Sequence, residues 1–221
     1  MQKELKLLLE HVSNITKINK EGFVCYAGNI DQHDIIIAKC GIGKVNSALR
    51  TYQLISEYRP DLIINSGVAG SVDKNVEIGT VLIADRVAYH DVWCGPETVY
   101  GQADGCPLYY RPYEKGLNIA ADSFIDSKFE IKYGLICSGD KFITSSEEVD
   151  KIKSDFPDAL GCDMESASIA QTCYKSGVPF MVIRVMSDMP GSGNNIDQYK
   201  NFWDEAPELT FKTVKQLIGR L

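Results

Sequence analysis

Short apolar runs rich in Ile and Val recur along this chain and constrain its fold more than any other feature. Several of them are apolar at consecutive positions, which is expected of strands that are covered on both faces. The chain is therefore expected to form a sheet with helices packed against both of its sides. The runs are FVCYAGNI, DIIIAKCG, DLIINSGVAG, TVLIAD, YGLICSGD and PFMVIRVMSD.

Segments with helical spacing separate these runs. One stops before Pro60, a second begins at Ser146 with acids in its first turn, and a third ends at Gly177, as the residue preferences at helix ends predict. Strands that alternate with helices predict an α/β fold with a largely parallel sheet in one domain. The predicted helices are KVNSALRTYQLISEY, SEEVDKIKSDF, ESASIAQTCYKSG and APELTFKTVKQLIGRL.

Charge and cysteine usage exclude several classes of protein. The 221 residues are 44% hydrophobic with a net charge of −7, which suits a packed core and argues against a nucleic-acid surface. No secretory signal or run of membrane-spanning length occurs, and the three histidines lack zinc-ligand spacing. The seven scattered cysteines are typical of reduced, buried thiols, so we expect a cytoplasmic protein without nucleic-acid or membrane partners.

Glycine-rich or polar segments follow four of the predicted strands: INSGVAG, CSGDKFI, RVMSD and CGIGK. Ligands gather where such strands end, although glycine also marks ordinary turns. Asp163 and Glu165 leave the same choice open, because buried carboxylates need a partner: they face water and a helix dipole, or they contact a ligand. Residues 89–116, rich in Tyr, Gly, Pro and Cys, predict a long functional loop or an interface.

Five ordered blocks give the chain a family resemblance. CGIGKVNSA, INSGVAGSV, SGDKFI, DMESASIA and RVMSD resemble the motifs of the nucleoside phosphorylase superfamily, and most closely those of its 5'-methylthioadenosine/S-adenosylhomocysteine nucleosidases. The resemblance implies one domain over 1–221, with a three-layer α/β/α fold around a mixed, mostly parallel twisted sheet. It also implies a homodimer, no metal or organic cofactor, and an 89–113 loop that lines the pocket for the 5'-substituent.

The resemblance assigns roles to the acidic segments. Glu165 would accept hydrogen bonds from the 2'- and 3'-hydroxyls of a ribose, Met164 would pack under the sugar, and Asp163 would serve or support the same pocket. Asp188, with a raised pKa at the end of a buried strand and held by Ser187, would protonate N7 of the leaving adenine. Without the resemblance, Asp163 is equally well a helix-start acid and Asp188 a helix N-cap.

Candidate residues for the water and the base follow from the same resemblance. Glu4 matches the glutamate that holds the attacking water, as one carboxylate does in inverting glycosidases; alone, it would be a solvated acid in a first helical turn. Phe142 would stack on adenine and the backbone of Ile143 would hydrogen-bond its edge, although an aromatic residue there is also ordinary core. Tyr199 or Phe202 is expected to close the pocket over the sugar.

Water is a better candidate nucleophile than phosphate. Phosphorylases carry an Arg and a Ser in the loop that matches INSGVAG, where this chain has Asn65 and Val68. The chain also departs from the nucleosidase pattern, because Val68, beside the sugar or the nucleophile, replaces a common Ser, and Asp163 replaces a common Glu. The Gly-rich segment MPGSGNNIDQ is longer than usual and is expected to form a flexible lid.

The start of the chain also differs from the family pattern. Family members begin with an apolar strand of the type MKIGIIGAM, and this chain opens at the last residue of that motif. We therefore expect a longer native product, and without the strand Glu4 would be poorly anchored.

Three functions stay open from the sequence. The first is hydrolysis of 5'-methylthioadenosine, S-adenosylhomocysteine or 5'-deoxyadenosine, which releases adenine. The second is a related nucleosidase such as futalosine hydrolase, or a phosphorylase. The third is a purine-binding protein without turnover, although the presence of Glu4, Glu165 and Asp188 together favours catalysis.

Overall fold

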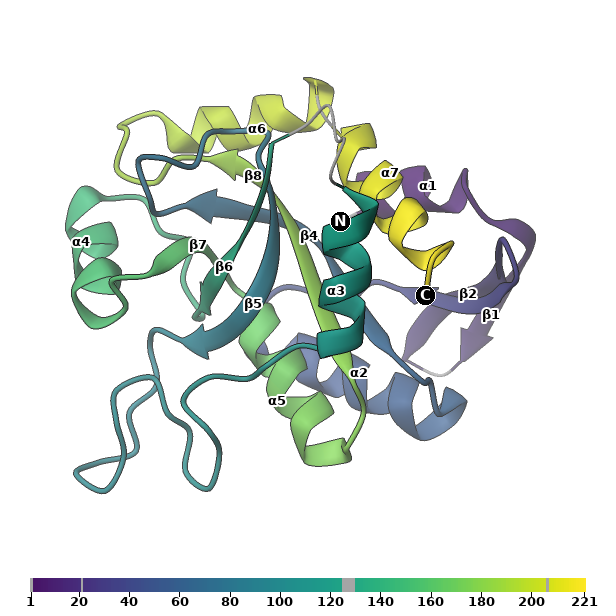
Figure 1. Cartoon of the computed structure of the whole chain (residues 1–221), viewed down its shortest axis with the longest axis horizontal. Helices are drawn as coiled ribbons and strands as arrows, with labels where there is room; N and C mark the ends of the chain where they lie inside the picture. The colour runs from purple at the N-terminus through teal and green to yellow at the C-terminus, as the bar shows by residue number, and fades with distance from the viewer. Residues whose placement is uncertain (1, 21, 125–129, 206) are drawn as a thin grey trace.

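The chain folds around a closed barrel of strands that a smaller sheet adjoins (Figure 1). The computed structural model describes residues 2–20, 22–124, 130–205 and 207–221, apart from the side chains of 2–4, 203–205 and 207–211. The strands are β1 (Ser13–Lys20), β2 (Phe23–Ile30), β3 (His33–Ala38), β4 (Ile63–Ser71), β5 (Val81–Tyr89), β6 (Ile131–Ser138), β7 (Ala159–Asp163) and β8 (Phe180–Asp188). The helices are α1 (Gln2–Leu9), α2 (Lys44–Tyr58), α3 (Glu114–Ser123), α4 (Ser146–Asp155), α5 (Ser166–Ser176), α6 (Asn195–Glu205) and α7 (Pro207–Ile218).

The barrel is a mixed sheet. Its strand order is β4-β7-β6-β5-β8, with β4–β8, β5–β6 and β6–β7 parallel and the two other pairs antiparallel. Strand β8 is buried at every position, as the consecutive apolar residues on either side of Arg184 predict. The predicted α/β class with a mixed, mostly parallel sheet is confirmed.

The runs FVCYAGNI and DIIIAKCG form β2 and β3, which lie outside the barrel. They pair antiparallel with each other, and β1 extends them into a three-stranded sheet. The expectation that these runs belong to one largely parallel sheet is wrong, because the short connection at Asp31 can join only antiparallel neighbours. Asp31 itself adopts the left-handed conformation of a tight turn, with φ of 50°.

Helices cover the barrel on both sides. Helix α5 packs on it through Ala167, Ile169 and Ala170, and α2 lies against the outside of α5. On the other side, α7 packs through Val214 and Leu217, with α1 and α3 beside it (Figure 1). The barrel therefore lies between two helical layers.

The helix boundaries that the sequence predicts are largely confirmed. Helix α2 ends at Tyr58, before Pro60, and α5 is closed by Gly177 in the left-handed conformation, with φ of 68°. Helix α4 begins at Ser146, and its N-cap is the preceding Ser145, whose hydroxyl accepts a hydrogen bond from the Glu148 backbone in a capping box.

Two strands gave no recognisable signal in the sequence. Strand β1 (SNITKINK) is exposed along most of its length and contains no apolar run. Strand β7 is short, and Asp163 is its last residue, three positions before α5 begins at Ser166. Its carboxylate accepts a hydrogen bond from the Ser166 backbone, so Asp163 does lie at the helix start, but it is buried there and does not face water.

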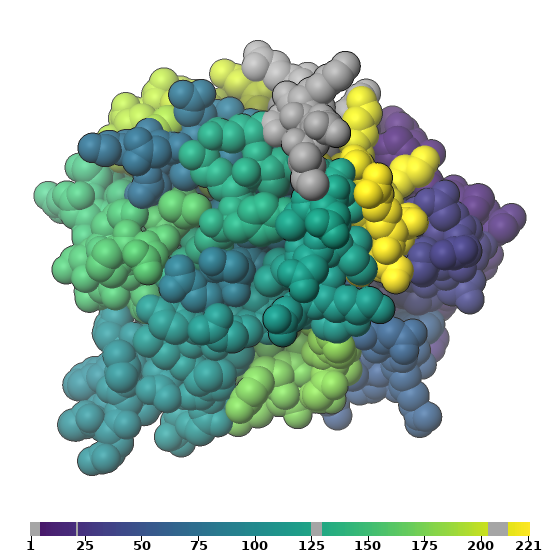
Figure 2. Space-filling model, in the orientation of Figure 1, coloured from purple at the N-terminus to yellow at the C-terminus, as the bar shows by residue number. Residues whose placement is uncertain are grey.

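The segment between β5 and α3 is the long loop that the sequence predicts. Residues 90–113 contain no helix or strand, apart from a bridge between Tyr110 and Val87, and the loop projects at the lower left of Figure 2. Within the described ranges, every helix is too short or too polar to cross a bilayer.

Candidate functional site

The ends of the barrel strands meet, as the glycine-rich segments predict. Gly70 of β4 lies opposite both Cys162 of β7 and Asp188 of β8. Ser138 of β6 lies opposite Asp163, the last residue of β7. This convergence brings the acidic segments of the sequence to one end of the barrel.

Asp163 is the buried anchor of this end. Its carboxylate accepts hydrogen bonds from Ser138 Oγ at 2.5 Å, from Ser166 Oγ, and from Arg184 Nε at 2.7 Å. Burial alone would raise the pKa of Asp163, but Arg184 and the two hydroxyls hold it below its ordinary value. Because both of its oxygens already accept protein donors, Asp163 braces the turn from β7 into α5.

Arg184 is a functional-site residue that the sequence analysis missed. Only 4% of its side chain is exposed, and besides Asp163 it contacts Ser166 Oγ at 3.0 Å through Nη2. Asn65, whose side chain also donates to Ser166 Oγ at 3.0 Å, completes this cluster. A charged residue inside the run PFMVIRVMSD was the available signal, because a buried guanidinium requires an acidic partner.

Glu165 occupies the N-cap position of α5. Its Oε1 accepts a hydrogen bond from the Gly43 backbone at 2.9 Å, which joins the CGIGK loop to the acidic segment. Burial and neighbouring Asp163 raise the pKa of Glu165, while Arg184 opposes the rise. A carboxylate has about four lone-pair sites, so Glu165 can accept further donors beyond Gly43. Met164 lies half-buried beside it.

Asp188, at the end of β8, is buried and 2% exposed. Its carboxylate accepts hydrogen bonds from Ser187 Oγ at 2.7 Å and from Asn195 Nδ2 at 3.1 Å. Burial raises the pKa of Asp188, as the sequence predicts, whereas the bond from Ser187 acts in the opposite direction. The N-cap interpretation of Asp188 is wrong, because α6 begins only at Asn195.

Asn195 is a second residue that the sequence analysis missed. Its side-chain amide donates to Asp188 and also to the Ile143 carbonyl, at 3.1 Å each. The Gly191 backbone donates to the Thr144 carbonyl at 3.2 Å. The segment expected to form a flexible lid is thus hydrogen-bonded to the 143–144 loop. Nothing in the sequence GSGNNIDQ distinguishes Asn195 from Asn194.

An aromatic pair flanks the buried acid. The Phe142 ring is 39% exposed and meets the Tyr199 ring edge-on, with centroids 5.4 Å apart. Phe202, the alternative to Tyr199, is buried in the core that α7 covers, and Tyr199 and Val68 pack on the edge of that core. Of the two candidates that the sequence left open, Tyr199 is therefore the one that reaches Phe142.

Glu4 lies within α1, but its side chain is outside the description. Its predicted contact with the attacking water therefore stays a prediction.

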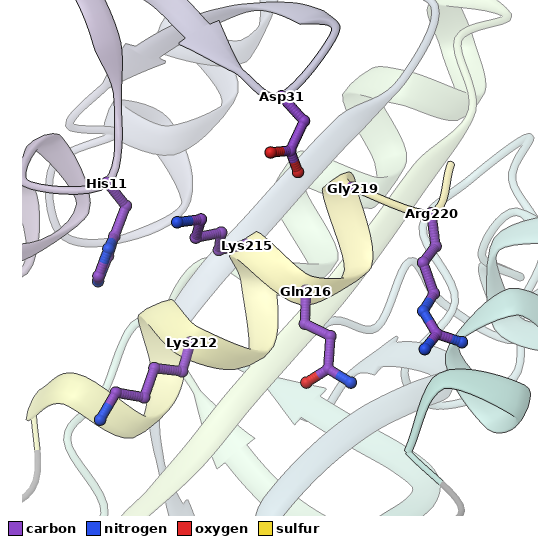
Figure 3. A pocket seen from close by; sticks show the side chains of 7 residues that line it. All are labelled: His11, Asp31, Lys212, Lys215, Gln216, Gly219 and Arg220. Carbon is purple, nitrogen blue, oxygen red and sulfur yellow. The ribbon is translucent and has the colours of Figure 1, made fainter.

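A separate pocket of about 440 Å³ lies between α7 and the β2–β3 turn. In Figure 3, Lys215 extends toward His11, whereas Lys212, Gln216 and Arg220 point in other directions, so the basic groups do not converge. In the part of the chain that the structure describes, no three His, Cys, Asp or Glu side chains are grouped to hold a metal ion.

The arrangement at the barrel end suits one kind of chemistry. A buried carboxyl with a raised pKa can deliver a proton to a leaving group, and a second carboxylate can accept hydrogen bonds from a diol. An exposed aromatic ring beside the acid offers a surface for a planar base.

Comparison with known proteins agrees with this chemistry. Residues 1–219 match the Phosphorylase superfamily. A 5'-methylthioadenosine/S-adenosylhomocysteine nucleosidase of Staphylococcus aureus is 36% identical over 224 residues, covering 100% of this chain and 97% of the relative.

Solved structures are similar over the whole chain. S-adenosylhomocysteine nucleosidase of Streptococcus pyogenes, in complex with 5-methylthiotubericidin, has a TM-score of 0.96 and 33% identity, covering 100% of this chain and 94% of that one. Futalosine hydrolase of Helicobacter pylori has a TM-score of 0.93 and 29% identity, with coverages of 100% and 95%.

Proposed function

Since the chain belongs to the phosphorylase superfamily, we propose that it is a purine nucleosidase that hydrolyses the N-glycosidic bond of 5'-methylthioadenosine and S-adenosylhomocysteine. The products are adenine and the 5'-thio-substituted ribose. The observation that carries this proposal is the buried carboxyl of Asp188, whose pKa burial raises, at the end of β8 beside the Phe142 loop. The names of relatives such as the Staphylococcus aureus enzyme agree with it.

Asp188 is the general acid in this mechanism. Cleavage sends the bonding electrons into the purine, and protonation of N7 makes adenine a far better leaving group. Proton transfer of this kind contributes about 10²- to 10⁴-fold to a rate. Ser187 and Asn195 aim the Asp188 carboxyl, Phe142 stacks on the base, and the backbone of Ile143 binds its edge.

Glu165 holds the sugar. Gly43 fixes its Oε1, and the remaining lone pairs accept the 2'- and 3'-hydroxyls. Met164 packs under the ring, and Tyr199 and Val68 close the pocket around it. Asp163 has the supporting role, because its oxygens already accept bonds from Ser138, Ser166 and Arg184.

Water is the nucleophile in this proposal, and Glu4 positions it on the face of the sugar opposite adenine. Asn65, where phosphorylases carry an arginine, is committed to Ser166 Oγ and bears no charge for phosphate.

The active unit that we propose is a homodimer. Val45, Leu49 and Tyr52 recur along one face of α2 and are 69, 60 and 60% exposed. Tyr174 of α5 and Trp93 of the long loop are also more than half exposed. A second copy of the chain would cover this apolar surface. We also place the protein in the cytoplasm, because its seven free thiols are typical of a reducing compartment.

The test is incubation of the chain with 5'-methylthioadenosine in phosphate-free buffer, with adenine followed by chromatography. Adenine release at a rate unchanged by added phosphate supports the hydrolase. Release that requires phosphate would instead identify a phosphorylase, and tight adenine binding without release would identify a binding protein.

Futalosine is the comparison substrate in the same assay, because a futalosine hydrolase shares the fold. A higher kcat/KM for futalosine than for 5'-methylthioadenosine and S-adenosylhomocysteine would contradict the proposed substrate class.

A further inference from the structure

Three loops at the active end of the barrel are joined by charged groups that the proposed chemistry does not use. We propose that Lys44 and Asp91 are positioning residues: their ion pair, together with the hydrogen bond from the Asp140 backbone to Asp91, ties the start of α2 to the loops after β5 and β6, and so holds Gly43 at Glu165 and Phe142 at the base. This inference rests on the proposed function, because it assigns Glu165 to the sugar and Phe142 to the purine.

The first half of the connection runs through Asp91, which follows β5. Lys44 Nζ lies 2.9 Å from Asp91 Oδ1 and 2.8 Å from Oδ2. The same Oδ2 accepts a hydrogen bond from the Asp140 backbone at 2.8 Å. Asp91 therefore binds the side chain of the first residue of α2 and the main chain of the loop after β6.

The second half runs directly between those two segments. Asp140 Oδ1 accepts a hydrogen bond from the Lys44 backbone at 2.7 Å. Gly43 permits this approach, because a Cβ at that position would lie 2.8 Å from Asp140 Oδ1 and its φ is 87°. Lys44, Asp91 and Asp140 thus form a closed ring of contacts.

The ring lies immediately next to groups that would touch the nucleoside. Gly43, which donates to Glu165 Oε1 at 2.9 Å, directly precedes Lys44 in the chain. Phe142 stands two residues beyond Asp140. Neither Lys44 nor Asp91 needs to contact the substrate. Their network of contacts with Asp140 places both Glu165, through Gly43, and the side chain of Phe142.

A second ion pair in the chain supplies a matched control. Asp73 accepts a hydrogen bond from the Asn75 backbone at 3.0 Å and pairs with Lys153 at 2.9 Å. Side-chain exposures are 27% and 20% for Lys153 and Asp73, against 25% and 30% for Lys44 and Asp91. The two pairs have similar chemistry and exposure, but the Asp73 pair braces α4 against the loop after β4 and has no contact with Glu165 or Phe142 in the described structure.

The experiment compares Asp91→Asn and Lys44→Met with Asp73→Asn and Lys153→Met. For the first pair we expect KM for 5'-methylthioadenosine to rise about tenfold, with a smaller change in kcat, because the lost hydrogen bonds position binding groups. The control pair should leave KM within about twofold. Lys44→Arg, which keeps the positive charge and can still pair with the Asp91 carboxylate, should raise KM less than Lys44→Met does.

Coupling to Glu165 separates positioning from a general structural role. In a Glu165→Gln background, Asp91→Asn should raise KM much less than in the wild type, because its effect passes through Glu165. Equal KM changes in the Asp91 and Asp73 variants, or full additivity with Glu165→Gln, would overturn the proposal.

Measuring adenine binding distinguishes a failure of this inference from a failure of the proposed function. Calorimetry with adenine alone should show a weaker Kd for Asp91→Asn and Lys44→Met than for the controls, since Phe142 is displaced. If the wild type releases no adenine, the proposed function fails while the adenine Kd still decides the positioning role. An unchanged Kd and an unchanged KM would reject that role.

Discussion

At the scale of single residues, two buried aspartates at the same end of the barrel have opposite pKa shifts. Asp163 faces Arg184, so its folded-state pKa lies below the unfolded value of about 3.9. It stabilises the fold above that value, and this contribution is lost as pH falls through the folded pKa. Burial raises the pKa of Asp188, so its contribution is present at acid pH and is lost as pH rises through that pKa.

The first prediction concerns the proposed general acid. Asp188→Asn keeps the shape of the side chain but removes the acidic proton, so kcat should fall by about 10²- to 10⁴-fold. The wild-type rate should decline as pH rises through the raised pKa, and the variant should lack that limb of the profile. Steady-state kinetics across pH measures both, and a variant with wild-type kcat would remove Asp188 from catalysis.

The second prediction concerns the buried pair beneath the sugar site. Asp163→Asn leaves Arg184 as a buried charge without its carboxylate, so the free energy of unfolding should fall by about 3–5 kcal/mol. Urea denaturation at neutral pH measures this. The control is Asp155→Asn, which breaks the exposed Lys151–Asp155 pair and should leave the free energy of unfolding nearly unchanged. Equal losses in the two variants would contradict the assignment of Asp163 as an anchor.

At the scale of elements, the candidate site residues lie where strands and helices begin or end. Glu165 is placed by the start of α5, Asp188 by the end of β8, and Gly43 by the turn into α2. Helix α4 follows the Phe142 loop directly, so its first turn sets where that loop ends. In its capping box the Ser145 hydroxyl accepts a hydrogen bond from the Glu148 backbone, and the Glu148 carboxylate accepts one from the Ser145 backbone.

The third prediction tests this cap. Ser145→Ala removes the acceptor for the Glu148 backbone, which should lower the free energy of unfolding by about 1 kcal/mol. Ser146→Ala, at the next position, leaves the capping box intact and should have a smaller effect. Chemical denaturation of both variants measures the difference, and a Ser146 variant that loses as much as the Ser145 variant would refute the role of the cap.

At the scale of the whole molecule, several of the exposed large apolar side chains lie on α2, α5 and the long loop. The same loop is joined to the active end through the hydrogen bond from the Asp140 backbone to Asp91. Assembly and substrate binding would therefore share one segment of chain.

The fourth prediction concerns assembly. Leu49→Glu places a charge in the apolar surface of α2 and should convert a dimer into a monomer. Ile15→Glu should leave the oligomeric state unchanged. Ile15 is 45% exposed but belongs to strand β1, which is not part of the proposed interface. Sedimentation velocity distinguishes the outcomes. A monomeric wild type, or dissociation by both variants, would contradict the proposed interface.

The sequence by itself determined the features that depend on local patterns. Short apolar runs marked β4, β5, β6 and β8, as in LII, VLIA, GLIC and FMVI, because strands covered on both faces carry apolar residues at consecutive positions. Pro60 and Gly177 marked helix ends, since their backbones disfavour continuing a helix. The ordered motifs also marked Glu165, Asp188 and Phe142 as candidate site residues.

Only the tertiary structure decided which groups meet across long stretches of chain. Asn195 approaches Asp188 through a loop without a local signal, and Arg184 reaches Asp163 only because β8 and β7 both flank β4. The role of Asp163 and the direction of each pKa shift depend on burial and on partners distant in sequence. Local patterns specify elements, whereas the packing of those elements sets the distances on which hydrogen bonds and charges depend.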